Sequence, residues 1–188
     1  DILLEKIAKT LFEIGCLNSF WSKLYAKFFQ DMIKEFPDVK NICIINFNNF
    51  LSLFENIEFI DINDTNYDLF CENNKKNEKR RAMSSFFINL TNYKVIDKIY
   101  IYNLLFKLLN DLDNNKNNKD MLQVNEEIIE NIFIMVKNGN EILKESPDKW
   151  EQITNHIVLL SKMKMIDNNG ISRKLSFKCM DLLEELEE

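Results

Sequence analysis

The stretch ISRKLSFKCMDLLEEL, at residues 171–186, carries the clearest helical pattern in this sequence. Its apolar residues recur at spacings of four, four, three and four: Ile171, Leu175, Cys179, Leu182 and Leu186. At about 100° per residue these positions form one narrow apolar stripe, which is typical of an amphipathic helix packed on a core. The stretch therefore predicts a final helix with one buried face.

Phe177 departs from this pattern. On a helical wheel it lies about 200° from Leu175, opposite the stripe and among charged residues that include Arg173 and Asp181. Two explanations are open for a large aromatic side chain on such a face. A following helix outside this sequence would cover Phe177 and Met180, or the face binds a protein partner. We prefer the partner, because aromatic residues together with Arg are the usual anchors of protein interfaces.

The composition of the whole chain favours long helices. Its 188 residues include only three Gly and two Pro, whereas hydrophobic residues make up 46% and Phe alone occurs fifteen times. Sandwiches and barrels need frequent turns with special backbone angles, so a chain this poor in Gly and Pro suits helices better. The hydrophobic content is sufficient for a sizeable core.

The apolar spacing predicts about eight helices. They cover residues 2–14, 20–36, 41–55, 75–92, 97–110, 126–138, 148–165 and 171–186. A β-strand is an alternative for residues 41–55, where Ile and Phe are frequent. We expect residues 56–74 to be irregular apart from a short helical turn at 67–70, and residues 111–120 to form a surface loop.

Particular residues predict where some of these helices begin and end. Gly15 and Gly139 are expected to end helices, because glycine is the usual residue just past a helix C-terminus. Asn125, and either Asn18 or Ser19, are expected to cap the following helices. Consecutive amphipathic helices that are each too thin to bury their own stripe predict an all-α fold, an α-solenoid in one domain over residues 1–188. A compact irregular bundle is the alternative.

The sequence offers little that forms a reaction centre. It has no Gly-rich phosphate loop, no HExxH motif and no nucleophile elbow. The single histidine, His156, lies among apolar residues of a helical pattern and is expected at the edge of the core. The four cysteines are far apart, so we expect free buried thiols and a reducing intracellular compartment: Cys16, Cys43, Cys71 and Cys179. We expect no metal, no cofactor and no enzymatic activity.

Charge allows nucleic-acid binding only through a local patch, because the net charge is −6. One basic group stands at the front of the helix predicted at residues 75–92: Lys75, Lys76, Lys79, Arg80 and Arg81. Positive charge at a helix N-terminus opposes the helix dipole, so a contact with phosphates or an acidic partner is one explanation. A solvated face partly neutralised by Glu78 is the other. The carboxylates of residues 126–130 are expected on a solvated face. No stretch approaches the about 18 consecutive apolar residues of a membrane helix.

Several stretches resemble the middle domain of translation initiation factor 4G, a HEAT-repeat scaffold. LYAKFF, at residues 24–29, resembles the family's AYANMC-type helix, and RRAMSSFFINLTNYKVI, at residues 80–96, is similar to its basic lead-in and KFIGELFKLKML pattern. NEEIIENIFIMVKNGNEIL, at residues 125–143, resembles DEESLECLCRLLTTIGKDL, and SRKLSFKCMDLLEE, at residues 172–185, resembles SSRIRFMLQDVLDL. The resemblance follows the correct order over nearly the whole chain.

The sequence also departs from this family. The family's helix glycine is Ile88 here, and its two arginines before the aromatic residue are Lys174 and Ser176, with Arg173 one place upstream. The family's first helix has no counterpart, and the chain starts without Met in a helical pattern. We therefore expect a fragment whose upstream part lies outside this sequence.

The resemblance implies a HEAT-like α-solenoid of about four to five antiparallel helix pairs. It also implies a cytoplasmic translation-initiation scaffold that binds and stimulates a DEAD-box RNA helicase of the initiation factor 4A type. The last repeats would face one lobe of the helicase, through Phe177, Lys174, Arg173 and Asp181. The first repeats would face the other lobe, through Asn18, Phe20 and Trp21.

Further partners follow from the same resemblance. RNA would bind the basic group that the charge pattern singles out, and a cap-binding protein would bind flanking segments. Related domains act in nonsense-mediated decay, splicing or the nuclear cap complex, which is one alternative function. A helical protein-interaction module without a helicase partner is another.

Overall fold

The regular secondary structure is entirely helical in the part of the chain that the structure, a computed structural model, describes: residues 2–61, 66–164 and 166–187. Eight α-helices pack together there: α1 (Ile2–Gly15), α2 (Ser22–Glu35), α3 (Val39–Leu51), α4 (Tyr67–Asn92), α5 (Lys98–Asn115), α6 (Leu122–Lys144), α7 (Pro147–Lys162) and α8 (Arg173–Glu187). Two 3-10 helices are short: η1 (Ser52–Phe54) and η2 (Lys119–Met121). The all-α prediction is confirmed.

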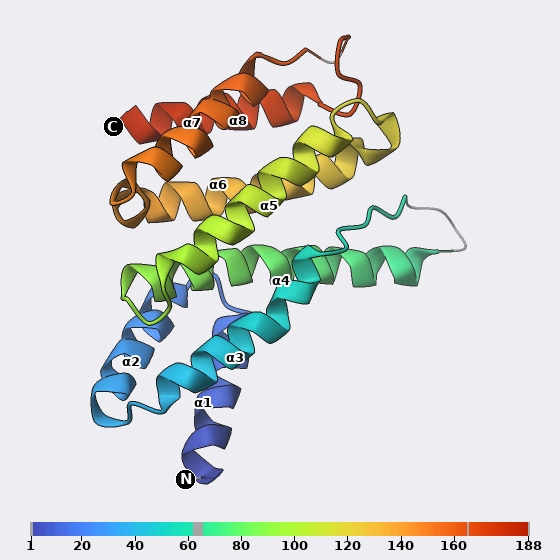
Figure 1. Cartoon of the computed structure of the whole chain (residues 1–188). Coiled ribbons are helices and arrows are strands. Elements are labelled where there is room, and N and C mark those ends of the chain that lie inside the picture. Colours follow the sequence, from blue (N-terminus) through green and yellow to red (C-terminus); the bar gives the residue numbers. More distant parts are fainter. Residues whose placement is uncertain (1, 62–65, 165, 188) are drawn as a thin grey trace.

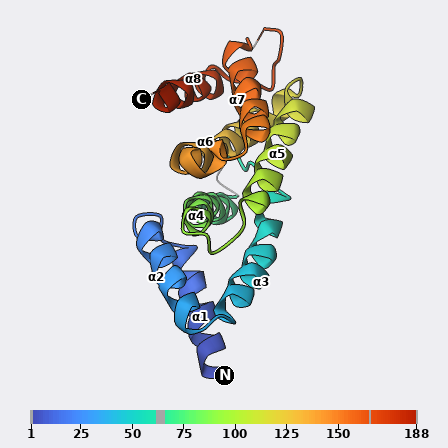
Figure 2. The same cartoon turned by 60° about the vertical axis from the view of Figure 1, so that its left-hand side comes forward.

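The helices form two rows (Figure 2). In the first row α2, α4, α6 and α8 follow one another, and each packs against the next, while α3, α5 and α7 lie in the second row. α1 packs against α2 and α3 at one end, and the C-terminus lies at the other (Figure 1). The first row is bowed, because α2 and α8 project to one side while α4 and α6 are set back.

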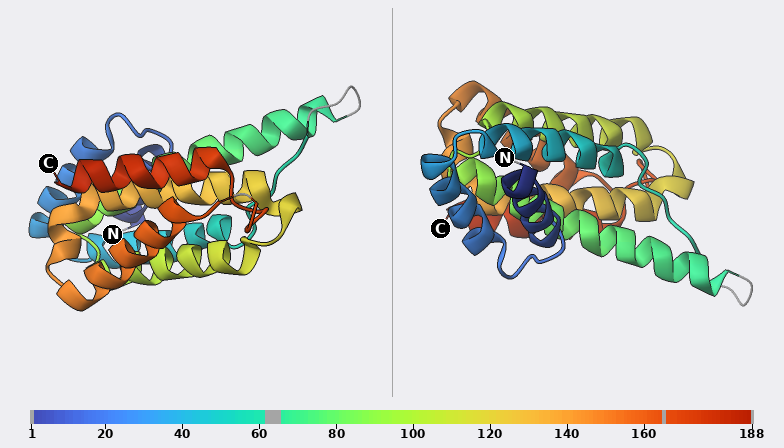
Figure 3. Two further views of the ribbon diagram at one scale, coloured as in Figure 1. Left: turned by 90° about the horizontal axis from the view of Figure 1, so that it is seen from above. Right: turned by 90° about the horizontal axis from the view of Figure 1, so that it is seen from below.

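Ion pairs fix the register of α6 against α8. Each pair joins residues 48 positions apart: Glu126 with Lys174 at 2.9 Å, Glu130 with Lys178 at 3.0 Å, and Lys137 with Glu185 at 2.5 Å. Because the partners advance together along both helices, α6 and α8 run in the same direction. Figure 3 shows the two helices side by side, and it also shows the N-terminal end of α4 projecting past its neighbours.

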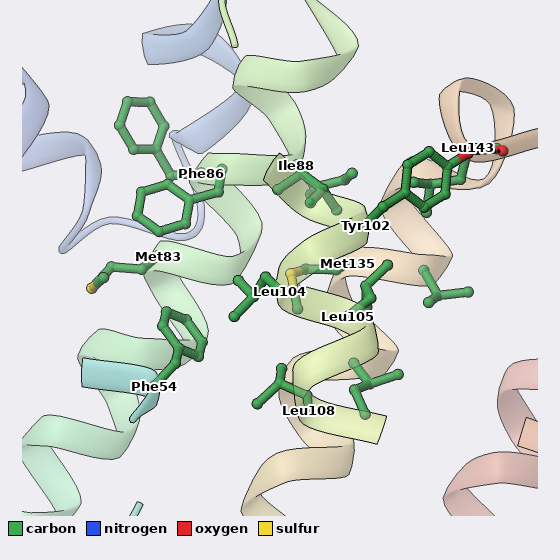
Figure 4. Packing of buried hydrophobic residues seen from close by; sticks show 14 of the residues in the cluster. Phe54, Met83, Phe86, Ile88, Tyr102, Leu104, Leu105, Leu108, Met135 and Leu143 are labelled. Atoms are coloured by element: carbon green, nitrogen blue, oxygen red, sulfur yellow. Dashed lines mark hydrogen bonds between the residues drawn. The ribbon is translucent and has the colours of Figure 1, made fainter. Parts of the chain in front are cut away.

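One hydrophobic cluster runs between the rows. Leu104, Leu105 and Leu108 of α5 lie around Met135 of α6, and all four side chains are buried (Figure 4). Nearer the N-terminus the cluster is aromatic, since the ring of Phe12 in α1 packs against four others: Phe29, Phe50, Phe86 and Phe87. Edge-on and offset aromatic contacts of this kind add to the stabilisation from apolar burial.

The final helix, α8, packs on the core through the apolar stripe that the sequence predicts. Its apolar stripe is fully buried up to Leu182, although the helix begins at Arg173 and so Ile171 precedes it. Residues 41–51 are helical and continue into η1, so the strand alternative is wrong. α1 ends at Gly15, as predicted.

The start of α4 differs from the sequence prediction. The helix begins at Tyr67 and is continuous, whereas only a short helical turn at 67–70 was expected in an otherwise irregular segment up to residue 74. This first part of α4 buries polar groups instead of an apolar stripe: Asn73 donates to the carbonyl of Glu58 at 3.1 Å, and Arg80 donates to that of Leu53 at 2.8 Å. Hydrophobic periodicity cannot detect a helix that is attached in this way.

Two other helices are longer than predicted. α5 continues to Asn115 into the expected loop, because Leu112 is buried and Asp113 lies 3.0 Å from the imidazole of His156. α6 begins before Asn125 and passes through Gly139, so neither residue is a helix end. The Asn125 amide instead donates to the carbonyl of Gly170 at 2.9 Å. His156 is half-buried, as expected.

Gly139 permits the close approach of α4 to α6. A Cβ atom at this position would lie 2.3 Å from Cδ1 of Ile88 in α4. Both residues are buried, so the space is already filled by the isoleucine.

The described cysteines are all free thiols, and three of them are buried. Burial raises the pKa of Cys43 and of Cys179 to about 12, and it raises the pKa of Cys16 as well. Cys71 is half-buried on α4.

Among the described residues, no helix has the length and apolarity needed to span a membrane, and no group of His, Cys, Asp or Glu could hold a metal ion.

Replacing Gly139 by alanine should destabilise the protein. The gain in helix propensity is at most about 1 kcal/mol, whereas overpacking against Ile88 costs typically about 1–3 kcal/mol. Urea unfolding should therefore give a net loss of about 1–2 kcal/mol. Adding Ile88→Ala should reverse the sign of the Gly139→Ala effect, because the new methyl group then fills a cavity. A stabilising Gly139→Ala change in the otherwise native chain would contradict this packing.

Thiol titration should separate Cys71 from the other cysteines. At pH 8 a disulfide reagent should modify Cys71 rapidly in the native protein. Cys16, Cys43 and Cys179 should react only on unfolding in urea, because their raised pKa leaves few thiolates and burial blocks access. The control is Cys71→Ser, which should abolish the rapid phase alone. Rapid native modification of all the thiols would show that the core is more open than described.

Candidate functional site

The exposed face of α8 is apolar and rimmed by cations. The side chain of Phe177 is 60% exposed, and Met180 on the next turn is 41% exposed. Both line a groove of about 690 Å³ between α8 and the end of α7, which holds three cations and no carboxylate: Ser161, Lys162, Met163, Lys164, Ile166, Arg173, Ser176, Phe177 and Met180. We call this groove with its rim the α8 face.

Only some of the predicted residues belong to the α8 face. Arg173 and Phe177 line it together. Lys174 pairs with Glu126 on the side of α8 that packs on α6. Asp181 is exposed one turn after Phe177. The structure therefore brings the aromatic residue and Arg173 together and directs Lys174 toward α6.

A second apolar surface lies at the other end of the row. Asn18 precedes α2 and accepts a hydrogen bond from the backbone N–H of Trp21 at 3.1 Å, which holds the turn before the helix. The side chain of Phe20 is 80% exposed, and the ring of Trp21 meets it edge-on at 4.7 Å. Exposed apolar side chains continue along α2, and together they form the α2 ridge: Leu17, Phe20, Trp21, Leu24 and Phe28.

Sequence reasoning found only part of the α2 ridge. Leu24 and Phe28 follow Phe20 at spacings of four, which is a second stripe on a helix whose first stripe contains the buried Ala26 and Phe29. Two stripes on one helix were the available signal for an exposed apolar face.

The basic group lies inside α4 and not at its front. The helix begins at Tyr67, so Lys75 stands beyond the second turn and the helix dipole has little effect there. The argument from the dipole is therefore wrong. Lys75 and Lys76 are exposed, and the ammonium of Lys79 lies 4.8 Å from the centre of the Phe50 ring.

Arg80 does not belong to the basic surface. Its side chain is 2% exposed, and its guanidinium donates to the carbonyl of Leu53 at 2.8 Å and to Oδ1 of Asn77 at 2.6 Å. Burial lowers the pKa of Arg80, and the nearby Glu127 opposes this shift. The prediction that Arg80 contacts RNA is therefore wrong, because no part of a nucleic acid could reach its side chain.

Glu127 joins the two arginines to α6. Arg81 donates to both oxygens of this carboxylate, and Nη1 of Arg80 lies 3.9 Å from Oε1. The hydrogen bonds raise the pKa of Arg81. Asn131 donates to Oε1 at 3.0 Å and accepts from Ser84 at 2.8 Å. Glu127 is 5% exposed, so the expectation of a solvated carboxylate here is wrong.

A long groove follows the outer surface of α4. One cavity of about 640 Å³ is lined by Leu17, Ser19, Lys75, Glu78, Lys79, Arg81, Ala82, Ser85, Ile134 and Asn138. A second cavity of about 990 Å³ is lined by Ser19, Phe20, Ser22, Lys23, Ser85, Asn89, Asn92, Tyr93, Lys94, Asn138, Glu141, Ile142 and Glu145. They share Ser19, Ser85 and Asn138, so we treat them as one feature, the α4 groove.

The α4 groove was not visible in the sequence as one site. Its walls come from α2, α4 and α6, and residues that meet across it are 46 to 67 positions apart in the chain. Only its basic end had a local signal, because Lys75, Lys79 and Arg81 are close in sequence.

Comparisons of the sequence with known proteins identify no relative. A scan of the sequence against models of protein families gives no match, and a search among curated proteins gives none either.

Replacing Glu127 by glutamine should be much more harmful than the same change at Glu126. The first variant leaves the buried Arg80 without its counter-charge, which typically costs about 3–5 kcal/mol. Glu126 pairs with the exposed Lys174, and such pairs are worth at most about 1 kcal/mol. Urea unfolding of both variants measures the difference. Equal stability losses would mean that Glu127 does not hold α4 against α6.

Proposed function

We propose that this chain is a HEAT-like helical scaffold that binds and stimulates a DEAD-box RNA helicase of the initiation factor 4A type and contacts RNA in translation initiation. The solenoid part of the proposal is supported by the row of parallel helices. Polar contacts join α4 to α6 at separations of 46–47 residues and α6 to α8 at 48 residues. HEAT and armadillo repeats are about 40–47 residues long.

The contact between α2 and α4 follows the same geometry with a longer separation. Ser22 meets Ser85, and Gln30 donates to the carbonyl of Tyr93, each across 63 residues. The extra length is accommodated by η1 and the segment that leads to α4. A stack of this kind exposes a long surface, which suits a scaffold better than a catalyst.

Two separated apolar surfaces support the helicase partner. The α2 ridge and the α8 face belong to helices at the two ends of the same row, with α4 and α6 between them (Figure 2). A protein with two mobile lobes can be held in one arrangement by a rigid partner that contacts both lobes. Stimulation then follows if the scaffold binds this arrangement more tightly than the others.

The exposure of Phe177 is the observation that carries the proposal. The apolar stripe of the same helix is buried in the core, whereas the side chain of Phe177 lies outside it. Its neighbours in the α8 face are a guanidinium, two ammonium groups and two methionines. A central aromatic residue with an arginine beside it is the usual composition of an interface hot spot.

Replacing Phe177 by alanine should weaken helicase binding without affecting the fold. We expect at least a tenfold loss of affinity, because central aromatic anchors typically contribute about 2 kcal/mol or more. Binding is measured in a pull-down with a purified initiation-type DEAD-box helicase, together with the helicase's RNA-dependent ATPase rate. The circular-dichroism melting temperature should not change.

Ile45→Ala is the matched control, because Ile45 is 59% exposed on α3 in the other row. It should leave helicase binding unchanged. Unaltered binding by Phe177→Ala would exclude the α8 face as the helicase contact. A lowered melting temperature would instead show that Phe177 belongs to the packed structure.

A further inference from the structure

We propose that the α4 groove binds single-stranded RNA along its whole length, from Lys75 to Lys94. The inference rests on the RNA contact of the proposed function and deepens it by naming the form of the RNA and its path. It also assigns residues that the basic group does not contain, Lys23, Tyr93 and Lys94, together with Phe20, which stands where the α2 ridge borders the groove.

The dimensions of the groove suit a single strand. The helical distance from Lys75 to Asn92 is about 25 Å at 1.5 Å per residue, which is long enough for several nucleotides. The walls are α2 and α6, and both pack directly on α4, so the groove is about one helix wide. Neighbouring helix axes are about 8–10 Å apart. A duplex is too wide to enter such a groove, whereas one strand fits.

Cations stand at both ends of the groove. Lys75, Lys79 and Arg81 line one end, and Lys23 and Lys94 line the other. Arg81 uses Nε and Nη2 to bind Glu127, so Nη1 lies outside this pair, and its side chain is 45% exposed. Single-stranded nucleic acids are held mainly by cations of this kind along the backbone.

The groove also contains carboxylates, but cations outnumber them. Glu78, Glu141 and Glu145 line it against five cations. Glu145 is paired with Lys98 at 2.8 Å, and this ion pair lowers the pKa of Glu145. The carboxylate of Glu127 faces the guanidiniums of Arg80 and Arg81, so the cluster has a net charge of +1, and only Arg81 in it is exposed to the groove.

Toward Lys94 the floor of the groove is polar, and hydrogen bonds hold its groups in place. Ser85 meets Ser22 at 2.9 Å, Asn89 donates to Ser22 at 3.0 Å, and Asn92 donates to the carbonyl of Asn138 at 2.8 Å. Ser22 and Asn89 are buried, so the hydroxyl and amide groups that RNA could reach are those of the half-buried Ser85 and Asn92. The floor is more apolar at the basic end, where Leu17, Ala82 and Ile134 line it.

Aromatic side chains stand beside the polar floor. Phe20 lines the groove with its ring mostly exposed, and this ring packs edge-on against that of Trp21. Tyr93 lines the groove as well, and Lys27 lies 5.9 Å from the centre of its ring. The ring of Phe20 is exposed and that of Tyr93 is half-buried, and rings next to cations are the usual stacking platforms for single-stranded bases.

The test uses fluorescence anisotropy with a labelled 12-nucleotide oligo(U) and a duplex RNA of the same length. The single strand should bind more tightly than the duplex, and its affinity should fall steeply as salt rises. The double variant Lys23→Glu/Lys94→Glu should lower the affinity at least tenfold and reduce the salt slope. Lys6→Glu/Lys9→Glu on α1 makes the same change in net charge at exposed positions and should have little effect.

Two substitutions of Phe20 examine stacking itself. Phe20→Tyr should retain binding, whereas Phe20→Leu should weaken it roughly 5- to 100-fold, since only the first keeps a ring. Equal losses in both charge variants, or equal binding of the duplex, would overturn the inference. So would unchanged binding by Phe20→Leu.

The helicase pull-down separates this inference from the proposed function. The Lys23→Glu/Lys94→Glu variant should still bind the helicase, and Phe177→Ala should still bind oligo(U). If the charge variant loses the helicase and keeps the RNA, the groove is a protein site and the inference fails. If no RNA binds at all, the inference fails while the helicase contact stands on its own result.

Discussion

The ion pair between Glu127 and the two arginines of α4 is the constraint on which the rest of the structure depends. It joins the middle helices of the first row, α4 and α6, and it buries one carboxylate with one guanidinium. A buried charge tolerates little displacement of its partners, because the uncompensated ion is costly. Ser84 and Asn131 continue the same contact, so the register of α4 against α6 is specified over more than one turn.

This register determines the surfaces available to partners. α2 packs on α4, α4 on α6, and α6 on α8. The α2 ridge and the α8 face therefore lie at the two ends of the bowed row. The α4 groove lies over α4, between α2 and α6, which both pack on α4. The same guanidinium of Arg81 that contributes to this register also lines the groove. The interaction that organises the fold thus also positions part of the proposed RNA site.

Much of the helical framework could be predicted from the sequence, and the errors have a common cause. The stripe in α8 was found because apolar spacing is a local signal, and Phe177 was found by its departure from that stripe. Residues 71–74 of α4 were not predicted to be helical, because this part of the helix attaches through the polar Asn73. The prediction of a helix end at Gly139 is wrong, because this glycine makes room for Ile88 of another helix.

The sequence by itself determined that the chain is helical, which faces are apolar and that Phe177 lies outside the core, because each follows from residues within a few turns of one another. Only the tertiary structure decided that Arg80 and Glu127 are buried, that Lys174 turns toward α6, and that three helices enclose one groove. These outcomes depend on neighbours tens of residues apart. No local pattern encodes that Arg80 is buried while the adjacent Arg81, which binds the same carboxylate, is half exposed.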